Sequence, residues 1–181
     1  MKNICATDDL EELLPIVDGT GKVSGCASRG ICHSGTGLLH PVVHLHLTDE
    51  EGRIYLQLRP QWKQIQPGRW DTAVGGHVGY NESIQEALNR ETKEEIGLLS
   101  VQSHEIGHYI FESDIEKELV YVFLHCGKTL TPKLSNEVAG GRYWSHKEIA
   151  EVIGKGILTP NFEEEYIRIV LPALKKVRQQ K

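Results

Sequence analysis

The sequence has few cysteines, no long apolar run and no apolar stretch among its first residues. Its 181 residues include four cysteines, and no two of them are spaced as a CxxC pair. The simplest interpretation is reduced thiols in a cytoplasmic protein. The apolar runs are too short to cross a bilayer, and the opening segment MKNICATDDLEEL has no apolar core like that of a signal peptide. We therefore expect a cytoplasmic protein without membrane spans.

The sequence also lacks blocks of like charge. Its formal net charge is −5, without a basic run or an acidic tail, so neither a nucleic-acid polymer nor a membrane surface is an expected partner. A small anionic ligand is still compatible, because a bound cation reverses the local field. The length and the 39% hydrophobic content predict one globular domain, residues 1–181, with an N-terminal hairpin extension at 1–37 and C-terminal helices at 145–181.

The expected elements run in the order strands, one central helix, strands, and then helices. Alternation from His40 to Thr48 predicts a strand with Val43, Leu45 and Leu47 on one face and three histidines on the other. The pattern as a whole predicts an α+β fold, with a mixed sheet sandwiched by helices. Further strands are expected at Leu13–Val17, from Val23, and at Arg53–Arg59, Trp70–Val74, Val120–His125 and Arg142–Trp144. Helices are expected at Glu82–Ile96, Lys147–Ile153 and Asn161–Arg178. Asn81 and Ser145 are the expected N-caps, Gly97 the left-handed C-terminal residue of the central helix, and Pro172 a break or kink in the last helix.

The expected central helix carries carboxylates where apolar side chains belong. On a helical wheel, one stripe begins with apolar residues and continues with acids: Ile84, Ala87, Leu88, Glu91, Glu94 and Glu95. Burying several ionised carboxylates together is unfavourable, and it raises their pKa values. A divalent cation removes the repulsion, and clustered oxygen ligands suit Mg²⁺ or Mn²⁺. The alternative is a solvated acidic face, with Arg90 and Lys93 as local partners.

The residues around this helix form a spaced motif. Five residues separate Gly76 from Glu82, and seven more lead to Arg90-Glu91-Thr92-Lys93-Glu94-Glu95-Ile96-Gly97-Leu98. This pattern resembles the Nudix box, which is glycine–x5–glutamate–x7–arginine–glutamate–aliphatic–x–glutamate–glutamate–x–glycine–aliphatic. Thr92 departs from it, because the family usually has an aliphatic residue there. Threonine is similar in shape to valine, so the departure affects local packing more than chemistry.

The resemblance implies a Nudix fold, an α/β/α sandwich, and a site built on the box. It implies that Glu91, Glu94 and Glu95 are metal ligands, or that one of them instead deprotonates the attacking water. It also implies a catalytic part for Arg90. It also implies that Arg90 and Glu82 form the ion pair that fixes the loop against the helix, and that a carbonyl near Gly76 joins the metal shell. The implied cofactor is Mg²⁺ or Mn²⁺, and the implied substrate is a small diphosphate compound.

Segments outside the box resemble isopentenyl-diphosphate isomerases and their hydrolase relatives. The segments are Leu39-His40, Arg59, Lys63, Pro67-Gly68-x-Trp70 and Gly76-His77. By this resemblance, His33, His40 and His77 are candidate metal ligands, although a structural role is open for each. Glu116-Lys117-Glu118 is similar to an acidic pair of the isomerases, so Glu118 is a candidate for both metal binding and catalysis.

Gly75 separates this chain from those isomerases. The isomerases have a cysteine immediately before the Gly-His or Ser-His dipeptide, and this chain has Gly75 there. Isomerisation needs a proton donor and an acceptor on opposite faces of the allyl group, so the missing thiol favours hydrolysis.

Three residues before the box are candidates for substrate binding. Arg59 and Lys63 are suited to phosphate oxygens, and Trp70 is suited to stacking on a base or sugar. Packing in the core is the alternative for Trp70, and a surface role is the alternative for Lys63. Glu137 is a further candidate for the general base, because Nudix enzymes often recruit an acid from such a loop.

The sequence as a whole favours metal-dependent hydrolysis of a diphosphate linkage in a nucleoside diphosphate joined to another moiety. The alternatives are an isomerase-like enzyme acting on isopentenyl diphosphate and a Nudix domain that senses a nucleotide without turnover. A homodimer is also implied as an option, because family members often dimerise.

Overall fold

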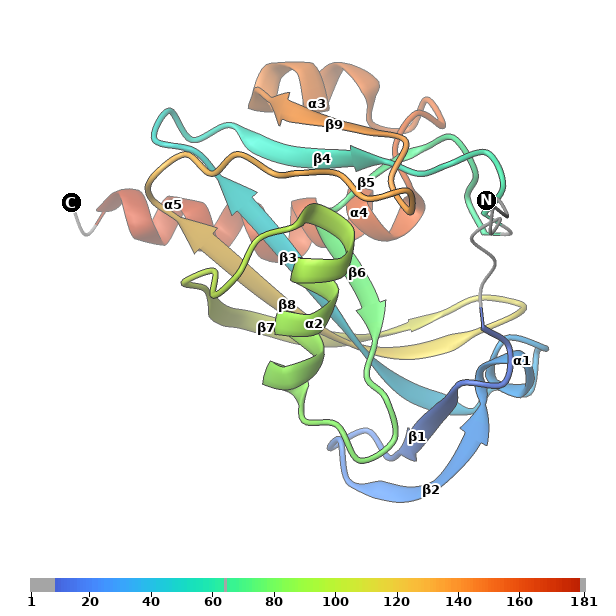
Figure 1. Cartoon of the computed structure of the whole chain (residues 1–181). Helices are drawn as coiled ribbons and strands as arrows, with labels where there is room; N and C mark the ends of the chain where they lie inside the picture. Colours follow the sequence, from blue (N-terminus) through green and yellow to red (C-terminus); the bar gives the residue numbers. More distant parts are fainter. Residues whose placement is uncertain (1–8, 64, 180–181) are drawn as a thin grey trace, which may run out of the picture.

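A computed structural model describes residues 9–63 and 65–179 of the chain (Figure 1). The strands are β1 (Leu13–Val17), β2 (Val23–Ser28), β3 (Leu39–Thr48), β4 (Ile54–Leu58), β5 (Trp70–Asp71), β6 (Val74–His77), β7 (His104–Glu112), β8 (Lys117–Cys126) and β9 (Gly140–Trp144). The helices are α1 (Arg29–Cys32), α2 (Ile84–Ile96), α3 (His146–Val152), α4 (Pro160–Glu165) and α5 (Leu171–Gln179), and a π-helical segment, Tyr166–Val170, joins the last two. No helix among the described residues is long and apolar enough to cross a bilayer.

The main sheet is mixed, and it forks at β3. Its path runs β5-β4-β3-β8-β7, with β6 also paired to β3 and β9 paired to β4. β3 is parallel to β8 and antiparallel to β4 and β6. Val42 to Leu45 pair with β6, whereas only Leu47 and Thr48 pair with β4. The two partners therefore diverge from β3 (Figure 1).

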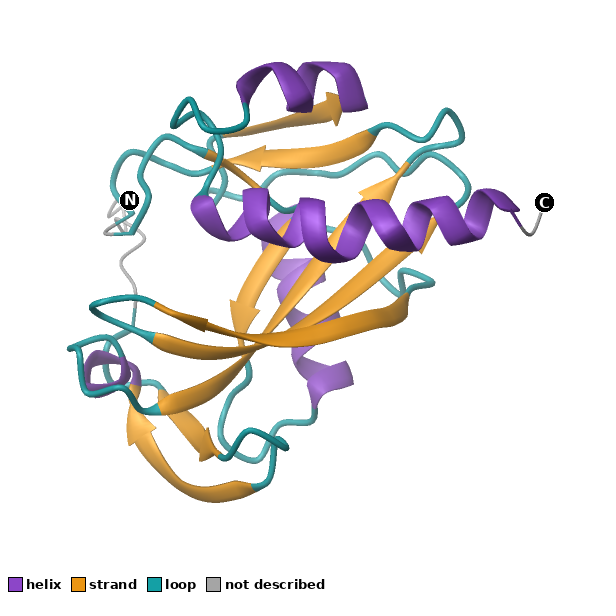
Figure 2. Ribbon diagram, turned by 180° about the vertical axis from the view of Figure 1, so that it is seen from behind, coloured by secondary structure: helices purple, strands orange, loops and turns teal. Residues whose placement is uncertain are grey.

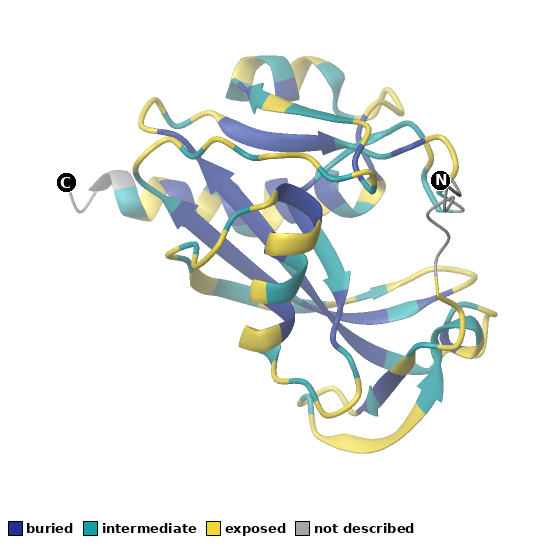
Figure 3. Ribbon diagram, in the orientation of Figure 1, coloured by how far each residue is buried: buried dark blue, intermediate teal, exposed yellow. Residues whose placement is uncertain are grey.

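Helices cover both faces of this sheet. α2 packs on one face, and the run from α4 to α5 lies across the other (Figure 2). Val43, Leu45 and Leu47 point into the α2 side of the core, as the alternation predicts. The side of α2 that faces the sheet is buried, and the opposite side is exposed (Figure 3). The predicted α+β sandwich with a mixed sheet and a C-terminal helix is confirmed.

The N-terminal hairpin is also confirmed, and it places α1 beside the main sheet. β1 and β2 are antiparallel. The Tyr80 N–H donates to the Leu13 carbonyl at 2.9 Å, which ties the hairpin to the loop before α2. The short helix α1 follows β2 directly. Cys26, Cys32 and Cys126 are free thiols, and Cys5 lies outside the described residues.

The N-cap of α2 differs from the prediction. Ser83, not Asn81, caps the helix, because Ser83 and Glu86 form a reciprocal capping box. Asn81 has a φ of +69° and lies in the turn before the cap. Gly97 takes the predicted left-handed position with a φ of +64°. Ser145 caps α3 as predicted, also through a capping box.

Three other expectations are wrong or incomplete. The strand expected at Trp70–Val74 is two strands, because the chain crosses there from β4 to β3. β7 was not expected, because a bulge at Gly107 interrupts its alternation. The C-terminal helix does not break at Pro172. The Leu171 N–H donates to the Tyr166 carbonyl five residues back, so a π-helical turn lies just before Pro172. This change of register accommodates the backbone N–H that proline lacks.

Candidate active site

A cavity of about 520 Å³ opens where the sheet forks, and we call it the fork cavity. It lies between β6 and the β4–β5 pair, which are the two branches of the fork. Its lining includes Gln57, Arg59, Lys63, Asp71, Gly75, Gly76, His77, Glu91, Glu95, Glu116 and Glu118. Side chains from α2, from both branches of the sheet and from β8 therefore converge on one space.

Glu95 is the most deeply buried box carboxylate. Its side chain leaves α2 toward the sheet, and the residue is 8% exposed. One oxygen, Oε2, accepts hydrogen bonds from Gln57 Nε2 at 3.0 Å and from the Gly75 N–H at 3.1 Å. Burial and, to a smaller extent, the nearby Glu91 raise the pKa of Glu95 to about 8. The carboxylate is thus held in position and is poorly stabilised as an anion.

Glu91 lies against the backbone of Gly76. A Cβ atom at position 76 would lie 2.0 Å from Glu91 Cδ, so the site needs glycine there. Burial raises the pKa of Glu91 to about 7, although Arg90 opposes the shift. The packing therefore places a carboxyl group that titrates near neutrality beside the Gly75–Gly76 backbone.

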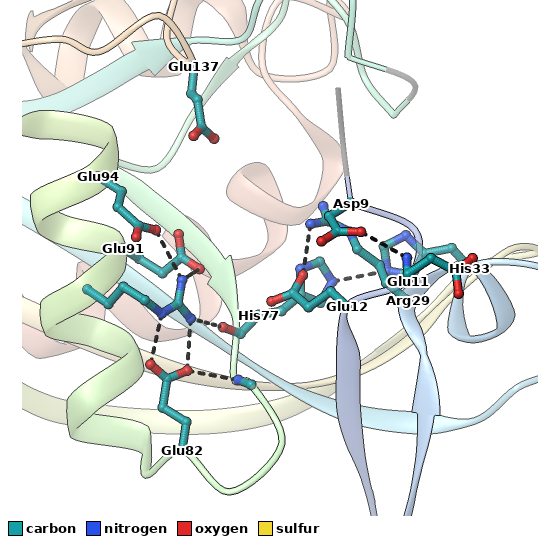
Figure 4. Close-up of polar contacts among 12 residues, drawn as sticks. Asp9, Glu11, Glu12, Arg29, His33, His77, Glu82, Glu91, Glu94 and Glu137 are labelled. Atoms are coloured by element: carbon teal, nitrogen blue, oxygen red, sulfur yellow. Dashed lines mark hydrogen bonds and ion pairs between the residues drawn. The ribbon is translucent and has the colours of Figure 1, made fainter. Parts of the chain in front are cut away.

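Arg90 ties the loop before α2 to the helix. Its Nε and Nη2 atoms each donate to Glu82 at 2.8 Å, and Nη2 also donates to the His77 carbonyl at 2.9 Å. Nη1 donates to Glu91 at 2.6 Å, so three acids, Glu82, Glu91 and Glu94, gather around one guanidinium (Figure 4). The ion pair between Arg90 and Glu82 that the family resemblance implies is present in the structure.

Glu94 and Thr92 occupy positions that the motif alone does not reveal. The Glu94 side chain is 50% exposed, receives a hydrogen bond from Arg90 at 3.1 Å and lies outside the lining of the fork cavity. Of the three box carboxylates, only Glu91 and Glu95 face the cavity.

Thr92 is buried, and its hydroxyl donates to the Leu88 carbonyl at 2.6 Å. The one departure from the motif is thus satisfied within the helix.

A second group of ligand-type side chains adjoins the box, and we call it the histidine cluster: His33, His40, His77 and Glu118. One potential ligand atom from each lies within 4.8 Å of all the others. Strand register brings them together. His40 pairs with Glu118 across β3 and β8, and Val42 pairs with His77 across β3 and β6. His33 follows α1, and its Nε2 atom lies 3.0 Å from His77 Nε2.

The histidine cluster has the properties of a metal site. His40 Nε2 is buried and has no hydrogen-bond partner among the described residues. Burial lowers the pKa values of His40 and His77, which favours neutral rings with free lone pairs. Burial also raises the pKa of Glu118 to about 8, and Glu116 adds to the shift. A divalent cation among these groups would give His40 Nε2 a bonding partner and would stabilise the charged form of Glu118.

The sequence matches a known family model over much of its length. Residues 38–162 match the model described as the NUDIX domain. The chain belongs to the Nudix family. It is 31% identical over 154 residues to an uncharacterized Nudix hydrolase of Streptomyces coelicolor. The matched region is 85% of this chain and 71% of that protein. It is 30% identical over 145 residues to the isopentenyl-diphosphate Delta-isomerase of Streptomyces griseus, covering 77% and 74% of the two chains.

Solved structures show the same Nudix fold. A crystal structure of a Deinococcus radiodurans protein aligns with a TM-score of 0.74 at 22% identity, covering 87% of this chain and 98% of that one. The MutT protein of Methanosarcina mazei aligns with a TM-score of 0.64 at 26% identity, covering 74% and 94%. The family and the fold together support a Nudix hydrolase, and Nudix enzymes generally use a divalent metal.

The residues expected to bind substrate in this Nudix hydrolase separate into two groups. Arg59 and Lys63 line the fork cavity, and Lys63 Nζ lies 3.9 Å from a carboxylate oxygen of Glu137. Glu137 also lines the cavity and projects from a separate loop (Figure 4). Trp70 is not part of the lining. It packs edge-on against Trp144 with ring centroids 5.1 Å apart, so the structure gives it a place in the core rather than in the cavity.

Sequence reasoning did not find Gln57, although a signal was present. Gln57 is the single polar side chain in the middle of the apolar strand β4 and is 4% exposed. A buried amide in such a strand needs a hydrogen-bond partner, and here the partner is Glu95. Asp71 also lines the cavity without having been expected there as a site residue, and His44 lines it from β3.

The metal-free Nudix hydrolase is expected to lose stability as the pH rises from about 4.5 to 8. Burial raises the folded-state pKa of Glu95 and Glu118 to about 8 and of Glu91 to about 7, against an ordinary value of 4.5. A raised carboxyl pKa contributes stability below the unfolded value, and that contribution is lost as the pH passes the folded value. Thermal unfolding in a chelator at pH 5 and pH 8.5 measures this change.

Divalent metal should reverse that loss. We expect Mn²⁺ to raise the melting temperature more at pH 8.5 than at pH 5, because binding requires the carboxylates to be deprotonated. Because the lowered pKa values of His40 and His77 add stability as the pH rises, the loss is measured against Glu95→Gln. An equal pH dependence in this variant and the wild type would contradict the burial of Glu95.

Proposed function

We propose that this Nudix hydrolase cleaves a diphosphate linkage in a nucleoside diphosphate joined to a second moiety, with Mg²⁺ or Mn²⁺ as the required ion. One observation carries the proposal. The Glu91 and Glu95 carboxylates lie against the Gly75–Gly76 backbone inside the fork cavity, and basic side chains line the same space. Buried oxygen ligands opposite basic groups suit a metal-bridged diphosphate.

Each residue of the cavity has a defined task in this proposal. Glu91 and Glu95 would hold the divalent ion, which when bound supplies charge neutralisation on the phosphate oxygens. A box carboxylate that does not ligate the ion would instead accept the proton from the attacking water. Arg59 and Lys63 would contact phosphate oxygens. Arg90 fixes the loop through Glu82 and the His77 carbonyl.

We further propose a second metal site at the histidine cluster. Its donors would be the rings of His33, His40 and His77 with Glu118. Three imidazoles suit Mn²⁺ or a softer dication better than Mg²⁺, whereas the oxygen-only pair on α2 suits Mg²⁺. Two sites of different chemistry would thus adjoin one cavity.

The second candidate function is an isomerase-like reaction on isopentenyl diphosphate. The histidine cluster favours it, because the matching positions resemble the metal ligands of the isomerases. Gly75 argues against it, because the position has no side chain to transfer a proton. Incubating the protein with isopentenyl diphosphate in heavy water separates the candidates. Deuterium incorporation would support isomerisation, and its absence together with hydrolysis of other diphosphates would support our proposal.

A substrate panel tests the proposed reaction directly. Nucleoside diphosphate compounds are incubated with Mg²⁺ or Mn²⁺, and release of a nucleoside monophosphate is measured. Turnover that requires the metal supports hydrolysis, whereas tight binding without turnover would indicate a sensing domain. A single domain over residues 1–181, a cytoplasmic location and a homodimer stay predictions.

A further inference from the structure

A buried carboxylate on the C-terminal helical run gathers three polar side chains from the sheet, and we call these four residues the Glu165 cluster. Glu165 of α4 is 1% exposed. It accepts hydrogen bonds from His44 Nδ1 at 2.8 Å, from His46 Nε2 and from the Tyr109 hydroxyl at 2.9 Å. Glu165 ends α4, and the helical run from α4 to α5 crosses the face of the sheet opposite α2 (Figure 2). Neither the Nudix box nor the histidine cluster includes any of its members.

His44 and His46 bond the same carboxylate but face different surroundings. His46 is fully buried, and its ring packs against Phe162 at a centroid distance of 5.9 Å. The His44 side chain is 12% exposed and lines the fork cavity. Because Nδ1 of His44 is bonded to Glu165, the opposite edge of the ring, with Nε2, is the one left for the cavity.

The His44 ring occupies the space beside Gly75. A Cβ atom at position 75 would lie 3.4 Å from His44 Cδ2 and 3.5 Å from Nε2, which is ordinary van der Waals contact and places the ring directly beside this residue. Gly75 also donates its N–H to Glu95, so the ring lies next to the residue that holds the box carboxylate. A phosphate group bound at Glu95 would therefore lie within the same part of the cavity as His44 Nε2.

The charges around His44 favour its protonated ring, which carries an N–H donor at Nε2. Burial opposes protonation of His44, but the Glu165 carboxylate outweighs it and raises the pKa of His44 to about 9. Burial likewise opposes ionisation of Glu165, but the two histidines outweigh it and lower the pKa of that carboxyl. The negative charges of Asp71 and Glu118 also raise the pKa of His44. A cationic ring in a cavity lined by acids is suited to a phosphate oxygen.

We propose that His44 contacts a phosphate oxygen of the diphosphate substrate through Nε2, and that Glu165 is the positioning residue that holds the ring in the cavity. The inference rests on the proposed diphosphate chemistry and adds a contact from outside the box. It gives the C-terminal helix α4 a part in substrate binding.

Binding of methylenediphosphonate, a diphosphate analogue with a P–C–P bridge, tests the inference. Calorimetry with Mg²⁺ compares the wild type with His44→Gln and with the matched control His46→Gln, which loses a bond to the same Glu165. We expect His44→Gln to weaken binding by about tenfold or more and to raise KM more than it lowers kcat. His46→Gln should change affinity by less than about twofold, because its ring lies outside the cavity lining.

Glu165→Gln tests the positioning role. It keeps the volume but removes the negative charge, so it should raise KM in the same direction as His44→Gln and shift the pH dependence of KM to lower pH. Unchanged affinity in His44→Gln, or equal losses in His44→Gln and His46→Gln, would overturn the inference.

A measurement on the wild type keeps the test independent of variant folding. In protein with ¹⁵N-labelled histidine, addition of Mg²⁺ and methylenediphosphonate should shift the Nε2 resonance of His44 and leave that of His46 in place. No shift at His44 would overturn the inference. If the substrate panel is turned over while His44 shows no effect, only this inference fails. If the panel shows no turnover, the proposed function fails separately.

Discussion

Replacing Glu95 by glutamine is expected to lower metal-dependent turnover of a diphosphate substrate by about a hundredfold or more, with the fold intact. Glu95 uses a single oxygen to accept the hydrogen bonds from Gln57 and Gly75. A glutamine oxygen can accept both bonds, so the substitution removes the charge from the cavity and leaves the local structure. Burial already disfavours the anion at Glu95. The metal-free variant should therefore be at least as stable as the wild type at pH 8.

Glu94→Gln is the matched comparison for this variant. The sequence gives Glu94 the same role as Glu95, but the structure places Glu94 outside the cavity lining and in contact with Arg90. We expect its turnover to fall by less than that of Glu95→Gln. Steady-state kinetics in Mg²⁺ and thermal unfolding in a chelator measure both effects. Normal turnover by Glu95→Gln would show that the box carboxylates are not the site.

Replacing His77 by glutamine is expected to weaken Mn²⁺ binding at the histidine cluster by about a hundredfold. His77 supplies one of four potential ligand atoms that lie within 4.8 Å of one another, and burial keeps its ring neutral. The backbone carbonyl of His77 remains available to Arg90, so the loop should stay in place. In pulsed electron paramagnetic resonance, the nitrogen couplings of bound Mn²⁺ should weaken or disappear.

His108→Gln serves as the control for that variant. His108 lies on β7 with a side chain that is 58% exposed, and its partner is Glu105 on the same strand. The substitution should leave Mn²⁺ affinity and the nitrogen couplings unchanged. Equal Mn²⁺ affinity in His77→Gln and the wild type would mean that the histidine cluster is a packing feature rather than a metal site.

The part of the site that lies within one contiguous segment could be predicted from sequence. Helical periodicity places Glu91 and Glu95 one turn apart on the side of Ala87 and Leu88, and the structure buries that side. The ion pair between Arg90 and Glu82 follows from the same motif. Glu94 shows the limit of this reasoning, because a helical wheel assigns a face but not the direction in which a long side chain leaves it.

The remaining parts of the site depend on register and on distant segments. The histidine cluster forms only because β3 pairs His40 with Glu118 and Val42 with His77, and sequence spacing does not fix such pairing. His44 and Glu165 are 121 residues apart, and their contact requires the C-terminal helix to cross the sheet. Local sequence gave no reason to place the two together.

A crystal structure with Mn²⁺ and methylenediphosphonate would show whether the box carboxylates hold a metal ion beside a diphosphate group. Anomalous scattering locates the metal ions, and the electron density locates the ligand. We expect a metal peak in contact with the Glu91 and Glu95 carboxylates, with a phosphonate group in the fork cavity beside it. Metal and ligand bound elsewhere, with both carboxylates still engaged only with protein groups, would contradict this expectation.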